Sequence, residues 1–168
     1  TETLASWSPE GFPILRIMPN TPSAIGKGMT ALCAAPGVAE EHLAAVETIL
    51  TGAGRIERLE ERLMDAFSAV AGCGPAFVYP FLEAMADGGV LAGLPRKQAM
   101  VFAAQTMLGA AALVLESGEH PGALKDAVCS PGGSTIEGVA VLERHGFRGA
   151  VLDAVEAACK KNTALGKA

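Results

Sequence analysis

Motifs for metal or nucleophile chemistry are lacking in this 168-residue chain. It has no Walker A loop, no G-x-S-x-G turn and no H-E-x-x-H zinc motif. Its three histidines, His42, His120 and His145, stand apart from one another and from clusters of cysteine or carboxylate. We therefore predict no metal site, and we place the histidines at solvated or helix-capping positions.

Charged residues are also few, since they make up 18% of the chain with a net charge of −5. This acidic balance gives no basic surface for a phosphate backbone, so we expect no nucleic-acid partner. Half of the residues are apolar, which is more than a monomer of this size buries. We therefore expect part of the surface to bind another chain.

Cysteines are scattered and form no C-x-x-C pair; they are Cys33, Cys73, Cys129 and Cys159. The first twenty residues show no basic segment followed by an apolar core, so we expect no secretion signal in this segment. Reduced thiols and a cytoplasmic location are the expectation.

The longest uncharged run, residues 98–115, reaches the lower length limit for a membrane span. Polar Gln105 and Thr106 interrupt it, and the preceding "LPRKQ" is typical of a helix start. We expect a helix buried at an interface and no membrane partner.

Hydrophobic patterning divides the chain near residue 60. Before it, the sequence predicts strands over 13–19, 29–35 and 55–60, with a helix over 38–54. After it, the pattern is helical throughout, and the predicted helices cover 61–72, 74–93, 95–117, 121–129, 135–146 and 148–165. The expected fold class is therefore mixed. Residues 1–60 would form the carboxy-terminal part of an α/β, Rossmann-like domain, and residues 61–168 an all-α domain for dimerisation and substrate binding.

The stretch "DAVCSPGGSTIEG", residues 126–138, offers two interpretations. Ser134 and Glu137 have the S-x-x-E spacing of a capping box, which would make the stretch an ordinary helix start. Gly132 and Gly133 permit a turn with positive φ and close approach of a ligand to backbone amides. Because a helix amino terminus presents unpaired N–H groups, the same stretch could hold a carboxylate or phosphate.

Three separated motifs resemble pyrroline-5-carboxylate reductase over essentially the whole chain from about residue 4. They are "RIMPNTPSAIGKGMTALCA", "AVAGCGPAFVYPFLEAMADGGVLAGLPRKQA" and "HPGALKDAVCSPGGSTIEGVAVLERHGFRGAVLDAVEAAC". The resemblance implies reduction of 1-pyrroline-5-carboxylate to L-proline with NADPH or NADH, the last step of proline biosynthesis. It also implies a homodimer through the helical domain, with dimers that assemble further into decamers.

The resemblance assigns roles to two groups of residues. The substrate would be held by Ser130, Gly132, Gly133, Ser134 and Thr135, and Thr135 would be the catalytic contact to the ring nitrogen. The nicotinamide end of the cofactor would lie beside Asn20, Thr21, Pro22, Gly72 and Gly74. An imine carbon is already electrophilic, so such a reaction requires no metal or nucleophile, and the cofactor supplies the difficult step.

The sequence departs from the family in two respects. The family's G-x-G-x-x-G fingerprint is absent from this chain, so on the order of a hundred residues of the family's cofactor domain are not in it, and we expect the chain alone to be inactive. Ala71, Cys73 and Cys129 also replace the hydroxyl residues that are usual in the family.

Two other functions remain open on the residues alone. The chain could be a non-catalytic helical association module, in which residues 130–135 only cap a helix. It could also be similar to hydroxyacid or 6-phosphogluconate dehydrogenases, which use a helix-borne lysine; Lys97 and Lys125 are the candidates, although neither lies in that family's usual motif.

Overall fold

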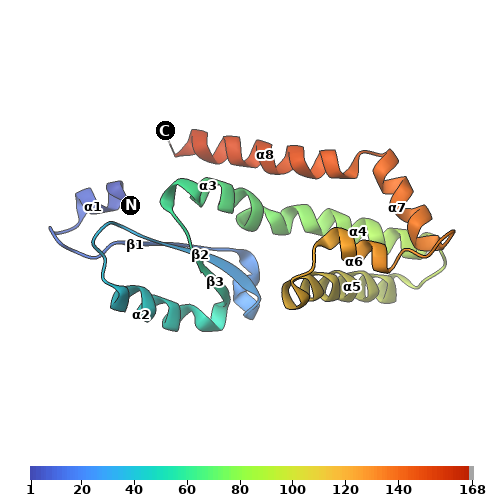
Figure 1. The fold of residues 1–168 in the computed structure, drawn as a ribbon, viewed down its shortest axis with the longest axis horizontal. Helices are drawn as coiled ribbons and strands as arrows, with labels where there is room; N and C mark the ends of the chain where they lie inside the picture. The colour runs from blue at the N-terminus through green and yellow to red at the C-terminus, as the bar shows by residue number, and fades with distance from the viewer. Residues whose placement is uncertain (167–168) are drawn as a thin grey trace. The chain divides into compact units, whose positions relative to one another are not determined.

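The computed structural model describes residues 1–166, which form two compact units (Figure 1). The sheet unit combines residues 1–75 with the end of the chain from residue 154, and the helical unit comprises residues 76–153. This division differs from the expected boundary at residue 60, because the end of the last helix is bonded to Asp65. Thr163 Oγ1 donates to Asp65 Oδ2 at 2.9 Å, and Asn162 Nδ2 donates to the Asp65 carbonyl at 3.3 Å.

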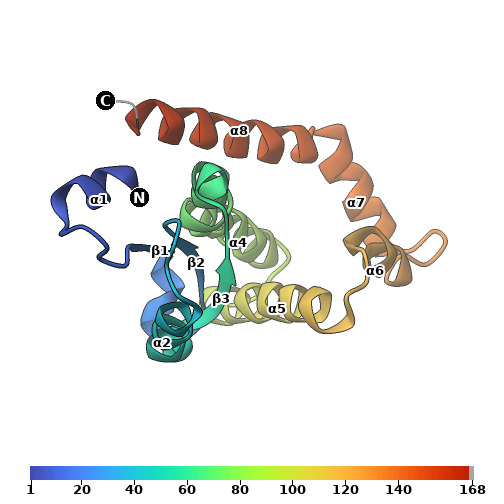
Figure 2. The same cartoon turned by 60° about the vertical axis from the view of Figure 1, so that its left-hand side comes forward.

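Three strands form the centre of the sheet unit. β1 (Leu15–Pro19) is antiparallel to β2 (Gly28–Ala34), and β2 is parallel to β3 (Gly54–Arg58), in the order β1-β2-β3. The helix α2 (Glu40–Leu50) makes the crossover between the two parallel strands, and Figures 1 and 2 both show it along one face of the sheet. The three predicted strands and this helix are confirmed, whereas the short helix α1 (Glu2–Trp7) was not predicted.

Alternation along β2 determines how the sheet packs. Ala31 and Cys33 point to the face covered by α3 (Met64–Phe67), where they form a buried cluster with Met64. Burial raises the pKa of the Cys33 thiol, so this cysteine stays protonated and packs as an apolar side chain.

The segment 61–72, predicted as one helix, is instead three short helical pieces. A 3₁₀ turn (Glu61–Leu63) leads into α3, and a π-helical turn (Ser68–Gly72) follows it. The Cys73 amide bonds the Ser68 carbonyl at 2.8 Å, five residues back, and the Ala71 carbonyl bonds a side chain outside the segment. Tertiary hydrogen bonds therefore replace the regular helical ladder here. We call residues 68–72 the π-turn; turns of this type are frequent at functional sites.

Five helices make up the helical unit. The first of them begins in the sheet unit, and the last of them ends there. All five correspond to predicted ones, with ends shifted by one or two residues: α4 (Gly74–Leu91), α5 (Arg96–Ser117), α6 (Pro121–Ala127), α7 (Ser134–Arg144) and α8 (Phe147–Leu165). A Cβ on Gly89 would lie 3.3 Å from Ala99 Cβ, so this glycine allows close approach of α4 and α5. Gly88 has open space around it within the chain.

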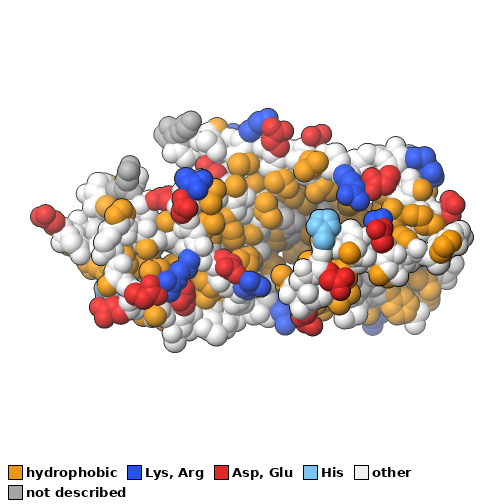
Figure 3. All heavy atoms as spheres, viewed as in Figure 1, with side chains coloured by type: hydrophobic (Ala, Val, Ile, Leu, Met, Phe, Trp, Pro, Cys, Tyr) orange, Lys and Arg blue, Asp and Glu red, His pale blue; other side chains and the backbone are white. Residues whose placement is uncertain are grey.

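The helical unit buries very little of its own apolar surface. Its buried cluster consists of Ala86, Ala99 and Ala103. Leu91, Leu115 and Leu152 are 90%, 67% and 70% exposed, and Figure 3 shows hydrophobic side chains across much of the viewed face. Two helical stretches, Glu61–Leu91 and Arg96–Ser117, meet the length and composition of a membrane span, and 11% of the apolar window in each is buried. Exposed surface of this extent marks a binding face.

Candidate functional site

The loop between α6 and α7 positions the predicted anion site (Figures 1 and 2). Gly133 is the N-cap of α7, Ser134 is its first helical residue, and no side chain caps the helix. The capping-box interpretation of Ser134 and Glu137 is therefore wrong, because the helix begins at Ser134 itself, one position earlier than that motif requires. The helix start has no capping side chain of its own in the described part of the chain.

Two glycines shape this loop for different reasons. Gly132 has φ of 65°, the left-handed conformation that glycine adopts without strain, and this confirms the predicted positive φ there. Gly133 has an ordinary φ of −79° but no room for a side chain, since a Cβ would lie 2.3 Å from Ser130 Oγ. Its amide donates to the Ser130 carbonyl at 3.0 Å. Ser130 and Gly133 thus close a tight turn in front of the helix.

Three backbone amides remain at this helix start. The N–H groups of Ser134, Thr135 and Ile136 have no acceptor within the described residues, whereas the Glu137 amide bonds the Gly133 carbonyl at 3.4 Å. The unpaired amides and the helix dipole together favour an anion such as a carboxylate. Ile136 was not among the predicted residues, although the first amides of any helix lack an intrahelical partner and this rule could have included it. Thr135, which also carries a hydroxyl, is exposed in the same first turn.

The second predicted group lies in the sheet unit, apart from the anion loop in the sequence. Thr21 and Pro22 begin a 3₁₀ turn (Thr21–Ile25) that leads from β1 towards β2. Asn20 precedes that turn, and its side chain is bonded to the backbone at Met29 and Ala71. Sequence patterns gave no signal for the role of these two backbone groups.

Gly72 and Gly74 follow on the other side of this contact. A Cβ on Gly72 would lie 3.3 Å from Ser68 Oγ and 3.4 Å from Met18 Cε, so the π-turn packs closely on the end of β1. Gly74 has open space where a side chain would be. The structure therefore brings Asn20 and Ala71 together, and it leaves open space at the side-chain position of Gly74.

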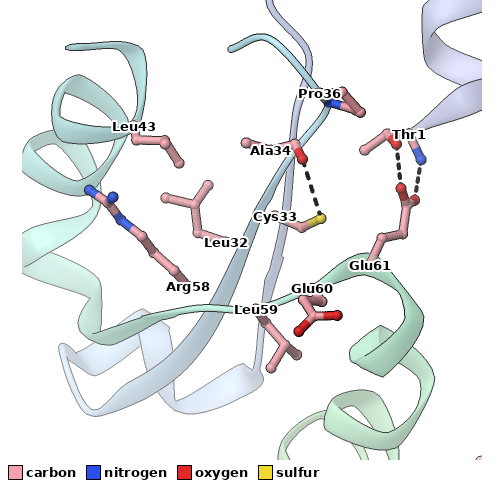
Figure 4. A pocket seen from close by; sticks show the side chains of 10 residues that line it. All are labelled: Thr1, Leu32, Cys33, Ala34, Pro36, Leu43, Arg58, Leu59, Glu60 and Glu61. Atoms are coloured by element: carbon pink, nitrogen blue, oxygen red, sulfur yellow. Dashed lines mark hydrogen bonds and ion pairs between the residues drawn. The ribbon is translucent and has the colours of Figure 1, made fainter. Parts of the chain in front are cut away.

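A separate cavity of about 670 Å³ opens in the sheet unit beside β2 and β3 (Figure 4). Leu32 and Leu43 line its apolar side, and Glu61, bonded to the amino group and hydroxyl of Thr1, lies at the other. None of the predicted site residues lines this cavity, and we assign it no function.

The lysine and histidine positions weigh against the alternative chemistry. Lys125 forms an ion pair with Asp126 at 2.5 Å, and this bond raises its pKa above the ordinary value, away from the range of an acid–base catalyst at neutral pH. His120 caps α6 by accepting from the Gly122 amide at 3.0 Å, as expected for a capping histidine. Among residues 1–166 no group of three or more His, Cys, Asp or Glu side chains could hold a metal ion.

Comparison with known proteins decides the family. Residues 61–165 match the family described as pyrroline-5-carboxylate reductase dimerisation. The chain belongs to the pyrroline-5-carboxylate reductase family. A Synechocystis pyrroline-5-carboxylate reductase is 52% identical over 161 residues, covering 94% of this chain and 60% of the relative. The Escherichia coli pyrroline-5-carboxylate reductase is 49% identical, covering 92% and 57%.

Solved structures of the family share the fold. A Plasmodium falciparum pyrroline carboxylate reductase with NADP bound has a TM-score of 0.89 and 37% identity, covering 98% of this chain and 66% of its own. The Coxiella burnetii pyrroline-5-carboxylate reductase has a TM-score of 0.92 and 32% identity, covering 98% and 62%. The mixed fold class, a Rossmann-like sheet portion followed by a helical dimerisation domain, is thereby confirmed. The chain spans about 60% of the length of the curated relatives.

Proposed function

We propose that this chain is the substrate-binding and dimerising part of an enzyme that reduces 1-pyrroline-5-carboxylate to L-proline with NADPH or NADH. The observation that supports it most directly is the start of α7, where three amides have no partner among the described residues, in a chain of this family. A reductase of a cyclic imino acid needs a site for one carboxylate, and these amides supply its donors. The cytoplasm is the proposed location.

The residues of the loop divide the work of holding the substrate. The carboxylate would accept hydrogen bonds from the amides of residues 134–136, with Ser130, Gly132 and Gly133 forming the turn that exposes them. The Thr135 hydroxyl can donate or accept, so it can support the ring nitrogen as it changes from imine to amine. The cofactor, when bound, supplies the hydride.

This chain has candidate residues for the nicotinamide end of the cofactor only. The uncovered backbone at Gly74 and the turn at Thr21 and Pro22 fit a flat ring placed against main chain. The Asn20 side chain, in contrast, already has two internal bonds. The pyrophosphate fingerprint is not in the sequence of residues 1–168.

The proposed partner is a second copy of the chain, bound through the helical unit, with assembly of dimers into decamers as the family resemblance implies. The exposed faces of α4 and α5 favour burial by this partner over burial in lipid, since the dimerisation family covers both helices. Static light scattering at micromolar concentration should report a dimer or larger. A monomer would refute this part of the proposal.

Replacing Thr135 tests the proposed activity. An intact enzyme can be rebuilt by placing the amino-terminal portion of the Synechocystis relative ahead of residue 1. In that enzyme, Thr135→Ala should lower turnover of the imino acid about ten-fold or more, the effect of one charge-assisted hydrogen bond. Thr135→Ser, which keeps the hydroxyl, should retain most of the activity, and both variants should remain assembled. Unchanged steady-state kinetics in Thr135→Ala would remove Thr135 from the mechanism.

A further inference from the structure

Asn20 joins three segments of the sheet unit through one side chain. Its Nδ2 donates to the Ala71 carbonyl at 3.0 Å, and its Oδ1 accepts from the Met29 amide at 2.9 Å. The donor and the acceptor partner together define which end of the carboxamide is nitrogen. Residue 20 thus connects the end of β1, the start of β2 and a π-turn that lies 51 residues further along the chain.

This use of the side chain differs from what its position would suggest. Asn20 is the N-cap of the 3₁₀ turn Thr21–Ile25, where asparagine commonly bonds the first amides of the helix, yet it makes no capping bond here. The side chain reaches across to the π-turn instead. The Ala71 carbonyl that it bonds lies in the π-turn, where the regular helical pattern is already interrupted.

The packing around this contact leaves little freedom between the two segments. The tight approach of Met18 Cε to the position of a Gly72 Cβ holds β1 against the π-turn. Two contacts therefore join the motif of Thr21 and Pro22 to the motif of Gly72 and Gly74. The first is the hydrogen bond from Asn20 to Ala71, and the second is the van der Waals contact of Met18 with Gly72.

We propose that Asn20 is a positioning residue that holds these two cofactor-facing motifs in register, and that it does so through Ala71 and Met29. The proposal rests on the proposed reductase function. Positioning of this kind matters for hydride transfer because a misplacement of about 1 Å can lower a rate by about a hundred-fold.

Two substitutions at Asn20 distinguish its hydrogen bond to Ala71 from its hydrogen bond to Met29. Asn20→Asp at neutral pH keeps an acceptor for the Met29 amide but places a carboxylate oxygen against the Ala71 carbonyl, so it breaks only the bond to the π-turn. Asn20→Ala breaks both bonds. Thr163→Val is the matched control, because it removes one side-chain hydrogen bond of similar length within the same unit, and that bond involves neither Asn20 nor residues 68–72.

Hydrogen exchange of the rebuilt enzyme without ligands gives the first measurement. Asn20→Asp should speed exchange in residues 68–75 and leave residues 28–31 protected, whereas Asn20→Ala should speed exchange in both. Thr163→Val should affect neither segment. Protection of 68–75 that is unchanged in both Asn20 variants would overturn the proposal.

Kinetics give the second measurement. Asn20→Asp should lower kcat about ten-fold or more with KM for the imino acid changed less than about two-fold, since the carboxylate site lies elsewhere. Thr163→Val should leave kcat unchanged even if it lowers the melting temperature as much as Asn20→Asp does. Equal kcat in wild type and Asn20→Asp would overturn the role of Asn20 alone. A wild-type rebuilt enzyme without reductase activity would instead overturn the proposed function.

Discussion

Adding one methyl group at Gly133 should disturb the anion loop by steric contact alone, because it neither adds nor removes a polar group. A Cβ there would lie 2.3 Å from Ser130 Oγ, about 1 Å short of ordinary contact, and 3.1 Å from the Ser130 carbonyl. The first contact forces the exposed Ser130 hydroxyl out of its present rotamer at a cost, and the second requires a backbone shift of a few tenths of an ångström. Together with weakening of the bond between the Gly133 amide and Ser130, we expect a loss of about 1–2 kcal/mol in the free energy of unfolding.

The displaced hydroxyl and the shifted amides should also weaken substrate binding. Loss of one hydrogen bond to a carboxylate of about 1.5 kcal/mol corresponds to an increase of roughly ten-fold in KM. The assay is steady-state reduction of the imino acid by the rebuilt enzyme, with thermal unfolding measured on the same samples.

A double-mutant cycle provides the control. Ser130→Ala removes the atom with which the new methyl group collides, so Gly133→Ala should destabilise a Ser130→Ala background less than wild type, by about 1 kcal/mol. If Gly133→Ala leaves both the melting temperature and KM unchanged, or if the two substitutions are additive, the turn does not depend on this close approach and the reasoning is refuted.

Two further substitutions test the sheet unit. Ser23→Ala should raise the free energy of unfolding by about 1 kcal/mol, because Ser23 Oγ is buried without a hydrogen-bond partner among the described residues; a lower melting temperature would contradict this. Arg58→Met should reduce acid sensitivity. Arg58 bonds Glu40 at 2.5 Å and Glu47 at 2.6 Å, and it lowers the pKa of both carboxyl groups below the ordinary value of 4.5. The stabilisation that these ion pairs give the folded state is therefore present above pH 4.5 and is lost as the pH falls through the lowered pKa values. Unfolding midpoints in urea between pH 3 and 7 should therefore vary less in Arg58→Met than in wild type, and equal slopes would contradict it.

Regular elements were predictable because their patterns are local. The short apolar run of β2 before Pro36 and Gly37, and the long uncharged stretch of α5 that follows Pro95, are properties of neighbouring residues, and both elements were found within two residues of the expected bounds. The π-turn is bonded to Asn20, which is distant in the sequence, so no local pattern contains that contact. The same holds for the bond between Thr163 and Asp65, which joins the end of α8 to the sheet unit.

The candidate site was predictable to a similar extent. The pair Gly132 and Gly133 indicated a turn before a helix with exposed amides, and the turn is there, but the S-x-x-E spacing placed the cap one residue too late. Local sequence could not reveal that Ser130 fills the space beside Gly133, nor that the Asn20 carboxamide is bonded to backbone groups on both sides. Both depend on how the loops fold back on themselves.

The bonds from Asn162 and Thr163 to Asp65 have a consequence for how the protein is made. These partners are 97 and 98 residues apart, so the sheet unit receives the end of α8 only after the whole helical unit has been synthesised. During translation, the nascent strands must wait for that helix with part of their surface uncovered. Premature termination before residue 160 would therefore damage the sheet unit as well as the helical unit.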